Sequence, residues 1–337
     1  MQTLDKFPPE LRLLFKGYFG YSRDYLKDKV SAVYILGGAA LEDWIPEWGD
    51  VDFLTVVDGD IDAQTEKAIH KLHDHIIKSY GSLAETMEGD YYPAKKFCGQ
   101  DTGLSHMSIG NRGEEREMKK DPMSAAAARH IKKYGCLIYG KDLRSGLPDT
   151  DEEEVGRDVA REFRDFIILH HPSGPPFSTP RSVNSLFGYG TKGTIYGWLQ
   201  GAVCLLYLKC GTEATKSSAG RDYRQHIGDQ FSELVTSACR IRNEWPPQID
   251  AGVKLKQLAG MLSEFLGVVW DAIGNVDLDK KSVKEETTAR PAAEEPKEIK
   301  EDKKTGTIKI DKTAKPDKPA GKSKSQGRKI KIGKYAK

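Results

Sequence analysis

The sequence predicts an α+β protein, and three features of its 337 residues support that class. An apolar run of strand length, Val33 to Leu36, precedes a glycine pair, and a second apolar run follows from Phe53 to Val57. The middle of the chain places apolar residues at helical spacing, and the final part has almost none that are large. We therefore expect a small mixed sheet with flanking helices in residues 1–150, an all-helical domain in residues 151–279 and a disordered basic tail in residues 280–337.

The first domain is expected to alternate helices and strands. Pro8-Pro9 opens a helix that leads into the first strand, because proline is favoured in a first helical turn. Residues 63–80 place apolar side chains at helical spacing and predict a helix over one face of the sheet. Residues 83–93 predict the next strand, and the Gly-rich residues 98–121 predict a loop or a hairpin. A helix from residue 122 to Gly135 and a short strand complete the domain.

Three histidines lie on the helix expected at residues 63–80. His70 and His73 are three positions apart and share a helix face, whereas His75 lies well round the helix. We interpret them as solvent-exposed polar side chains rather than as a metal site.

The second domain is expected to contain helices only. An acidic run at residues 149–154, DTDEEE, favours a helix N-terminus and sets the domain boundary near residue 150. Amphipathic patterns predict helices at residues 155–170, 231–242 and 253–273. The apolar helix expected at residues 194–210 is the predicted core of this domain.

The charge of the chain is divided between its body and its tail. Residues 1–280 carry 34 Lys and Arg against 41 Asp and Glu, a net charge of −7, whereas the rest carries 18 against 9, a net charge of +9. The last nineteen residues have seven basic side chains and no acid. This pattern fits weak binding to nucleic acid or another polyanion, and it fits a solubilising tail equally well.

Cysteine content and hydropathy favour a reduced, cytoplasmic protein. The five cysteines are an odd number with no CxxC pair, so neither a disulfide framework nor a zinc site is indicated. The N-terminus lacks a signal pattern, and no apolar run approaches the ~18 residues of a membrane helix, so we expect no membrane partner.

Two aspartates provide the main functional signal. Asp50 and Asp52 point to the same side of an extended segment, because side chains alternate along a strand. Two such charges are tolerable if they are exposed or if a hard cation such as Mg²⁺ lies between them. The flexible pair Gly37-Gly38 allows backbone N–H groups to approach a phosphate. The plain structural alternative is that Gly49-Asp50 forms a turn and Asp52 is a strand-edge charge.

This combination resembles the signature of the polymerase-β-like nucleotidyltransferase superfamily. That signature is an apolar residue, Gly, Gly or Ser, a spacer of roughly ten residues, and Asp-apolar-Asp-apolar. The matching residues are Leu36, Gly37, Gly38, Asp50, Val51, Asp52 and Phe53. Within the superfamily the chain looks most similar to the aminoglycoside adenylyltransferases. The resemblance covers roughly residues 30–245 and is strongest at residues 36–53.

The resemblance implies a third carboxylate on a neighbouring strand, acting as general base toward the acceptor hydroxyl. Glu88 lies in the segment EGDYYP, which is similar to the family's Glu-Gly-small-Tyr-x-Pro segment, and is therefore our choice. Glu85 is the alternative. On one strand the two residues would face opposite sides of the sheet, so only one of them can join the aspartates. Asp90 shares the parity of Glu88 and is a further candidate.

The resemblance also implies a phosphate-binding lysine in the second domain. The segment CGTEATKSSAGRDY is similar to a family segment whose lysine contacts the nucleotide phosphates, and Lys216 occupies that position. Val203 stands where these enzymes often carry a second basic residue. Either this phosphate contact is missing or another arginine replaces it, and the candidates are Arg221, Arg224 and Arg240.

Together these resemblances imply a Mg²⁺-dependent transfer of AMP from ATP to a hydroxyl acceptor. The resemblance implies an aminoglycoside-like small molecule as the acceptor, and Trp44, Trp48, Asp43 and Glu47, which lie close to the motif, would suit a cationic sugar. A protein or RNA acceptor is one alternative. Another is a catalytically inactive module that binds nucleotide or nucleic acid.

Overall fold

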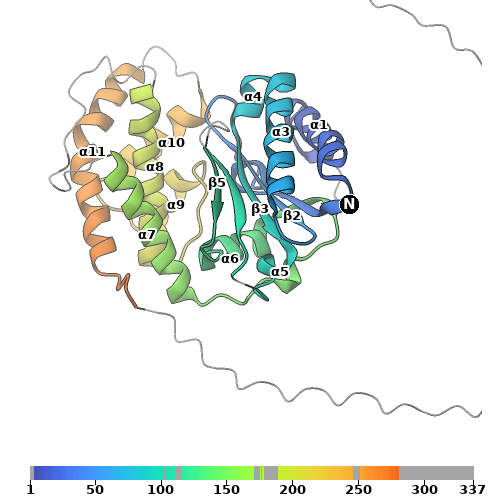
Figure 1. Ribbon diagram of the computed structural model, residues 1–337. Helices are drawn as coiled ribbons and strands as arrows, with labels where there is room; N and C mark the ends of the chain where they lie inside the picture. The colour runs from blue at the N-terminus through green and yellow to red at the C-terminus, as the bar shows by residue number, and fades with distance from the viewer. Residues whose placement is uncertain are drawn as a thin grey trace, which may run out of the picture. The chain divides into compact units, whose positions relative to one another are not determined.

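A six-stranded mixed sheet forms the first half of the molecule (Figure 1). The computed structural model describes residues 4–101, 103–110, 115–170, 175, 177, 189–245 and 251–280, so the tail beyond Lys280 lies outside the described residues. The strand order is β5-β4-β3-β2-β1-β6, in which β2 and β3 run parallel and the other neighbours run antiparallel. The predicted mixed sheet is thereby confirmed. Its strands are β1 (Val30–Ile35), β2 (Val51–Val57), β3 (Met87–Pro93), β4 (His106–Gly110), β5 (Glu115–Lys119) and β6 (Cys136–Gly140).

Helices cover both faces of this sheet. On one face α1 and α3 lie side by side and share a core with Val33, Val51 and Phe53 (Figure 1). The opposite face packs Leu54 against side chains of α5 and α6. The helices of this half are α1 (Pro9–Leu26), α2 (Gly37–Ala40), α3 (Ala63–Tyr80), α4 (Ser82–Glu85), α5 (Ala94–Phe97) and α6 (Ala125–Tyr134).

The second half of the described chain is helical, as predicted. Its helices are α7 (Glu152–His170), α8 (Tyr189–Cys210), α9 (Ala219–His226), α10 (Ser232–Asn243) and α11 (Ala251–Gly274). Helix α8 packs against the other four, which explains why it is apolar on all sides. Its Trp198 is fully buried and stacks on Phe265 of α11 at a centroid distance of 4.3 Å.

The two halves have separate hydrophobic cores within one compact unit. One large cluster lies between Phe7 and Ile138, and the other lies between Ala160 and Ile273. We propose that the domain boundary lies between β6 and α7, near residue 150. Among the described residues, no helix is both long enough and apolar enough to cross a bilayer.

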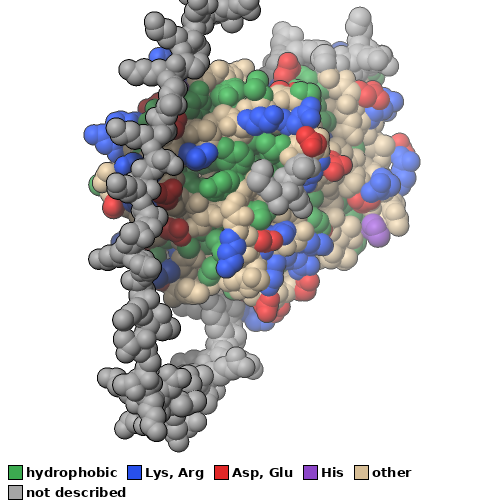
Figure 2. Space-filling view, turned by 90° about the vertical axis from the view of Figure 1, so that its right-hand side faces the viewer, with side chains coloured by type: hydrophobic (Ala, Val, Ile, Leu, Met, Phe, Trp, Pro, Cys, Tyr) green, Lys and Arg blue, Asp and Glu red, His purple; other side chains and the backbone are tan. Residues whose placement is uncertain are grey.

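The surface beside α1 carries both signs of charge. Figure 2 shows basic and acidic side chains interspersed with apolar ones on the face that lies at the right of Figure 1. Opposite charges on this face therefore lie close to one another.

Two expectations for the first half are wrong. The segment expected to form one strand from Leu83 begins as helix α4, and β3 starts only at Met87. Local hydrogen bonds explain the difference, because Ala84 N–H donates to Gly81 O at 2.9 Å and the Thr86 hydroxyl donates to Leu83 O at 2.8 Å. Glu85 consequently lies on a helical turn and not on the strand.

His73 is buried, not exposed as expected. Its ring stacks on Phe53 and lies 2.9 Å from the hydroxyl oxygen of Tyr91. Burial lowers the pKa of His73 to about 3, so the ring is neutral at physiological pH. Between residues 98 and 121 the chain forms the hairpin of β4 and β5, one of the two forms expected there.

Candidate functional site

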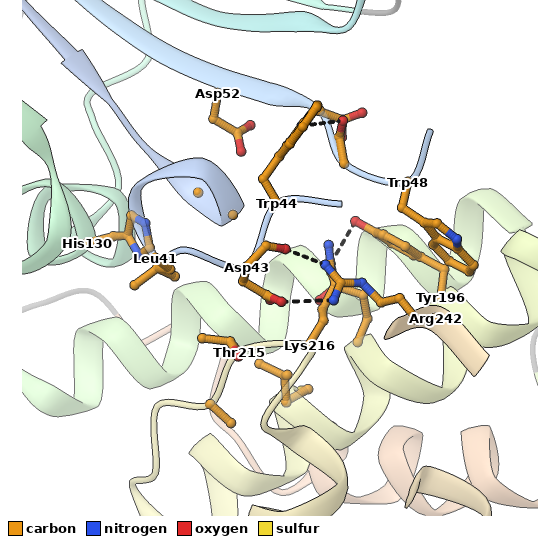
Figure 3. Close-up of a pocket in the computed structure, with 18 of the residues that line it drawn as sticks. Leu41, Asp43, Trp44, Trp48, Asp52, His130, Tyr196, Thr215, Lys216 and Arg242 are labelled. Carbon is orange, nitrogen blue, oxygen red and sulfur yellow. Dashed lines mark hydrogen bonds and ion pairs between the residues drawn. The ribbon is translucent and has the colours of Figure 1, made fainter. Parts of the chain in front are cut away.

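A cavity of about 470 Å³ lies between the start of β2 and the helices of the second half. Gly37, Gly38, Asp50 and Asp52 line it from the sheet side, and Lys216 lines it from the helical side. Figure 3 shows Asp52 on its strand and Lys216 on the facing loop. The structure therefore brings together residues that are more than 160 positions apart in the sequence.

Gly37 lies against one of the aspartates. Its φ is +53°, and a β-carbon added there would lie 1.8 Å from Asp52 Oδ2. At Gly38 the nearest atom would be Asp43 O at 3.4 Å, which is an ordinary contact. The backbone also joins the two segments, because Leu36 N–H donates to Asp52 O at 2.9 Å. Only glycine at position 37 allows the turn and the carboxylate to approach this closely.

The two aspartates lack sufficient compensating charge. Burial raises the pKa of Asp52 to about 6, the charge of Asp50 adds to this rise, and Lys216 opposes it. Asp50 retains solvent exposure, yet the cavity walls desolvate its carboxyl group enough to raise its pKa, again opposed by Lys216. These shifts mean that the ionised pair is unfavourable here without another cation.

The donor atoms of this pair fit magnesium. Carboxylate oxygens are the ligands that Mg²⁺ prefers, and Mg²⁺ is commonly held by one or two carboxylates together with water and substrate phosphates. Among the described residues, no group of three or more His, Cys, Asp or Glu side chains is arranged to hold a metal ion. A magnesium ion held by Asp50 and Asp52 would therefore need its remaining ligands from water or from a bound nucleotide.

Lys216 brings positive charge to the opposite wall. It lies in the segment between α8 and α9, and its ammonium nitrogen is 4.3 Å from the centroid of the Tyr196 ring. It opposes the rise in the pKa of Asp50, Asp52 and Glu162, because its charge is close to all three carboxyl groups.

Glu88 lies beside Asp52 on the neighbouring strand. The parallel register pairs Asp52 with Glu88, so their side chains leave the same face of the sheet. Glu88 is half-buried and is not among the described residues that line the cavity. Asp90 pairs with Leu54 further along β3, and its carboxylate is 3.9 Å from the ring of His106. The register therefore places Glu88 closer than Asp90 to the aspartate pair.

Glu162 is a cavity residue that the sequence reasoning missed. It lies on α7, and although its side chain retains solvent exposure, the cavity walls desolvate the carboxyl group and raise its pKa, an effect that Lys216 opposes. Val159 and Phe166, which also line the cavity, are three and four positions away on the same helix face. The sequence did contain a signal for this residue, because Glu162 is a charged residue on the otherwise apolar helix face of Val159 and Phe166.

Arg242 is the second missed residue. Val203 lines the cavity as expected, but Arg221, Arg224 and Arg240 are not among the described lining residues. Arg242 does line it, and its guanidinium forms a buried ion pair with Asp43 at 2.9 Å.

The residues expected to hold the acceptor are only partly brought together. Trp44 and Trp48 line the cavity, whereas Glu47 is not among the described residues that do. Trp48 packs edge-on against Trp245 at a centroid distance of 5.1 Å. Asp43 lines the cavity as well, but its ion pair with Arg242 occupies its carboxylate. On the helical side, Glu162 lines the cavity with a carboxylate.

Comparison with known proteins identifies a structural neighbour. The described fold is similar to the crystal structure of spectinomycin adenyltransferase AAD(9) from Enterococcus faecialis with ATP and spectinomycin. The two chains share a fold. The TM-score is 0.51 at 15% sequence identity, and the match covers 76% of this chain and 98% of that chain. No protein-family model matches this sequence, and no curated protein does either.

Proposed function

We propose that this protein is a Mg²⁺-dependent nucleotidyltransferase that moves AMP from ATP to a hydroxyl group of a small molecule. The observation that carries the proposal is the cavity itself, in which Gly37, Asp50 and Asp52 face Lys216. The neighbour with this fold was crystallised with ATP and with spectinomycin, which supports the same class of reaction.

Each residue has a distinct task in the proposed reaction. Asp50 and Asp52 hold Mg²⁺, which when bound neutralises negative charge on the triphosphate. The turn at Gly37 and Gly38 lets the backbone approach the phosphates. Lys216 adds positive charge from the helical side, where charge develops as pyrophosphate leaves.

Glu88 is the proposed general base. It would take the proton of the acceptor hydroxyl as that oxygen attacks the α-phosphorus and the bond to pyrophosphate breaks. Its register beside Asp52 supports this assignment.

The proposed acceptor is a cationic, aminoglycoside-like molecule. Trp44, Trp48 and Tyr196 line the cavity with aromatic side chains, and Glu162 lines it with a carboxylate. Aromatic faces and carboxylates both attract ammonium groups. The net charge of −7 on residues 1–280 also attracts a cationic acceptor at long range. We place the protein in the cytoplasm, where ATP and Mg²⁺ are supplied.

The test is transfer of label from ATP. Purified protein is incubated with ATP labelled in its α-phosphate, with Mg²⁺ and with a panel of aminoglycosides. The matched variants are Asp52→Ala and Asp60→Ala, since Asp60 is an exposed aspartate beyond the end of β2. We expect label on a drug with wild type and Asp60→Ala, and a loss of at least ~100-fold with Asp52→Ala. Equal activity of wild type and Asp52→Ala would show that the site assignment is wrong.

The same assay distinguishes the proposed function from a second candidate, which is transfer to RNA or protein. The basic tail is compatible with a nucleic-acid or other polyanionic partner, so RNA and protein acceptors are included. Label on RNA or protein and not on a drug would identify a different acceptor. Absence of Mg²⁺-dependent turnover with every acceptor, together with tail-dependent nucleic-acid binding, would favour an inactive binding module.

A further inference from the structure

The segment that carries Lys216 is attached to the sheet half at both ends. This segment, residues 211–218, connects α8 to α9 and is called the Lys216 loop below. Glu213 bonds to the sheet half near one end of the loop, and Ser217 bonds to it near the other. Lys216 lies between these two points, so both attachments restrain the position of its ammonium group.

Asp43 makes the attachment at Ser217. Its carboxylate accepts hydrogen bonds from the Ser217 hydroxyl and, at 2.9 Å, from Arg242 Nη1. Arg242 also donates from Nη2 to Asp43 O at 2.7 Å and from Nη1 to Ser217 Oγ at 2.8 Å. Figure 3 shows Asp43 linked to Arg242 at the edge of the cavity. The three residues thus form one network between the sheet half and the helical half.

Helix α6 makes the attachment at Glu213. The Glu213 carboxylate pairs with Lys133 at 2.8 Å and with Arg129 at 2.9 Å, and it accepts a hydrogen bond from the Tyr134 hydroxyl, so all three partners lie on α6. Arg129 also pairs with Glu152 at the start of α7. Helix α6 therefore restrains the first part of the Lys216 loop.

The Asp43 network is buried and also touches the glycine turn. The side chains of Asp43 and Arg242 are 7% and 5% exposed, so their charges are almost fully removed from water. A buried ion pair is tolerated when further hydrogen bonds satisfy it, and Arg242 has them. Asp43 N–H donates to Gly38 O at 2.8 Å. The same residue therefore restrains the phosphate-facing turn and the Lys216 loop.

We infer that Asp43 is a positioning residue of the candidate site: through Arg242 and Ser217 it orders the Lys216 loop and holds Lys216 opposite Asp50 and Asp52. The ordering of the loop stands on the contacts alone. Its consequence for ATP binding rests on the proposed function.

The first measurement is hydrogen–deuterium exchange of the Lys216 loop in the full chain without nucleotide. Asp43→Asn and Arg242→Lys should each speed exchange of the loop amides at least tenfold. The control Lys280→Gln breaks an exposed ion pair with Glu153 and should leave loop exchange unchanged. If Asp43→Asn fails to fold, Ser217→Ala keeps the ion pair and should still speed exchange, and Ser217→Thr should restore protection. Unchanged exchange in Ser217→Ala and Arg242→Lys overturns the inference.

The second measurement is a double-mutant cycle on the Kd of ATP with Mg²⁺, read by calorimetry. Asp43→Asn should weaken ATP binding at least tenfold in the wild-type background and have little effect in a Lys216→Ala background. Equal losses in the two backgrounds would show that Asp43 does not act through Lys216, which overturns the inference. If wild type binds no ATP, the proposed function fails, and the exchange measurement alone decides whether Asp43 orders the loop.

Discussion

Asp50 and Asp52 illustrate how the environment of a residue determines its chemistry. On an exposed strand they would be two ordinary surface charges. In this cavity the walls partly desolvate both carboxyl groups and raise the pKa of each, although Asp50 retains solvent exposure, and the proximity of Asp50 raises the pKa of Asp52 further. A bound cation would relieve that unfavourable charge, which links the stability of the protein to the function proposed for it.

The charge of Asp52 should make the cation-free protein less stable as pH rises. Its pKa of about 6 exceeds its ordinary value, so the folded state binds more protons than the unfolded state, and stability falls as pH rises through 6. Asp52→Asn should therefore increase the free energy of unfolding at pH 8 by at most about 3 kcal/mol. The gain should shrink at pH 5, and Mg²⁺ should reduce it at pH 8. Urea unfolding at both pH values checks this, and a gain independent of pH would contradict it.

Gly37 should tolerate substitution much less well than Gly38. In Gly37→Ala the new β-carbon meets Asp52 Oδ2 at a position with positive φ, whereas in Gly38→Ala it meets only Asp43 O at 3.4 Å. We expect Gly37→Ala to lower the free energy of unfolding by about 1–3 kcal/mol. Gly38→Ala should change it by less than about 1 kcal/mol. Thermal unfolding of the two variants side by side is the measurement, and equal losses would show that the close approach to Asp52 is unimportant.

At the scale of elements, the parallel pair of β2 and β3 sets which carboxylates meet. Its register places Glu88 beside Asp52, whereas α4 removes Glu85 from the strand. The sequence patterns identified the strands and helices that pack against one another, because burial imposes a clear periodicity on them. They did not identify α4, because a single helical turn held by local hydrogen bonds has too few residues to show any period.

The assignment of Glu88 is tested with two matched variants. Glu88→Gln keeps the shape of the side chain but removes its basicity, so we expect the rate of transfer to fall about 100-fold or more. Glu85→Gln changes the same group on α4 and should retain the wild-type rate. Steady-state rates with labelled ATP compare them. Loss of activity in Glu85→Gln alone would reverse the assignment.

At the scale of the whole molecule, the candidate site exists only because two separately packed halves meet. The sequence motif singled out Gly37, Gly38, Asp50 and Asp52, which line the cavity from the sheet half, but it did not point to His130 of α6, which lines the cavity as well. Glu162, Arg242 and the pairing of Asp43 depend on which helix faces meet the sheet half, and no local pattern specifies that. The resemblance pointed to Lys216 because its segment has a recognisable composition, whereas Arg242 lies in an ordinary amphipathic helix.

The basic tail should be separable from the proposed reaction. Residues 1–280 alone would carry a net charge of −7, and the face shown in Figure 2 mixes both signs of charge. A chain ending at Lys280 should therefore keep its transfer activity and lose retention on heparin, since polyanion binding depends on clustered positive charge. Chromatography at increasing salt, run beside the activity assay, checks this. Loss of activity on truncation would assign the tail a role at the site.

The central claim is that Asp50 and Asp52 hold the metal ion of a nucleotide site. Its most direct test is a crystal structure determined from crystals of the protein soaked with ATP and Mn²⁺. Anomalous scattering then locates the ion independently of any assumed mechanism. We predict a manganese peak within coordination distance of carboxylate oxygens of both Asp50 and Asp52, because carboxylates suit Mn²⁺ as they suit Mg²⁺. The triphosphate should lie between Gly37-Gly38 and Lys216. A nucleotide bound elsewhere, or an ion away from both aspartates, would contradict the account.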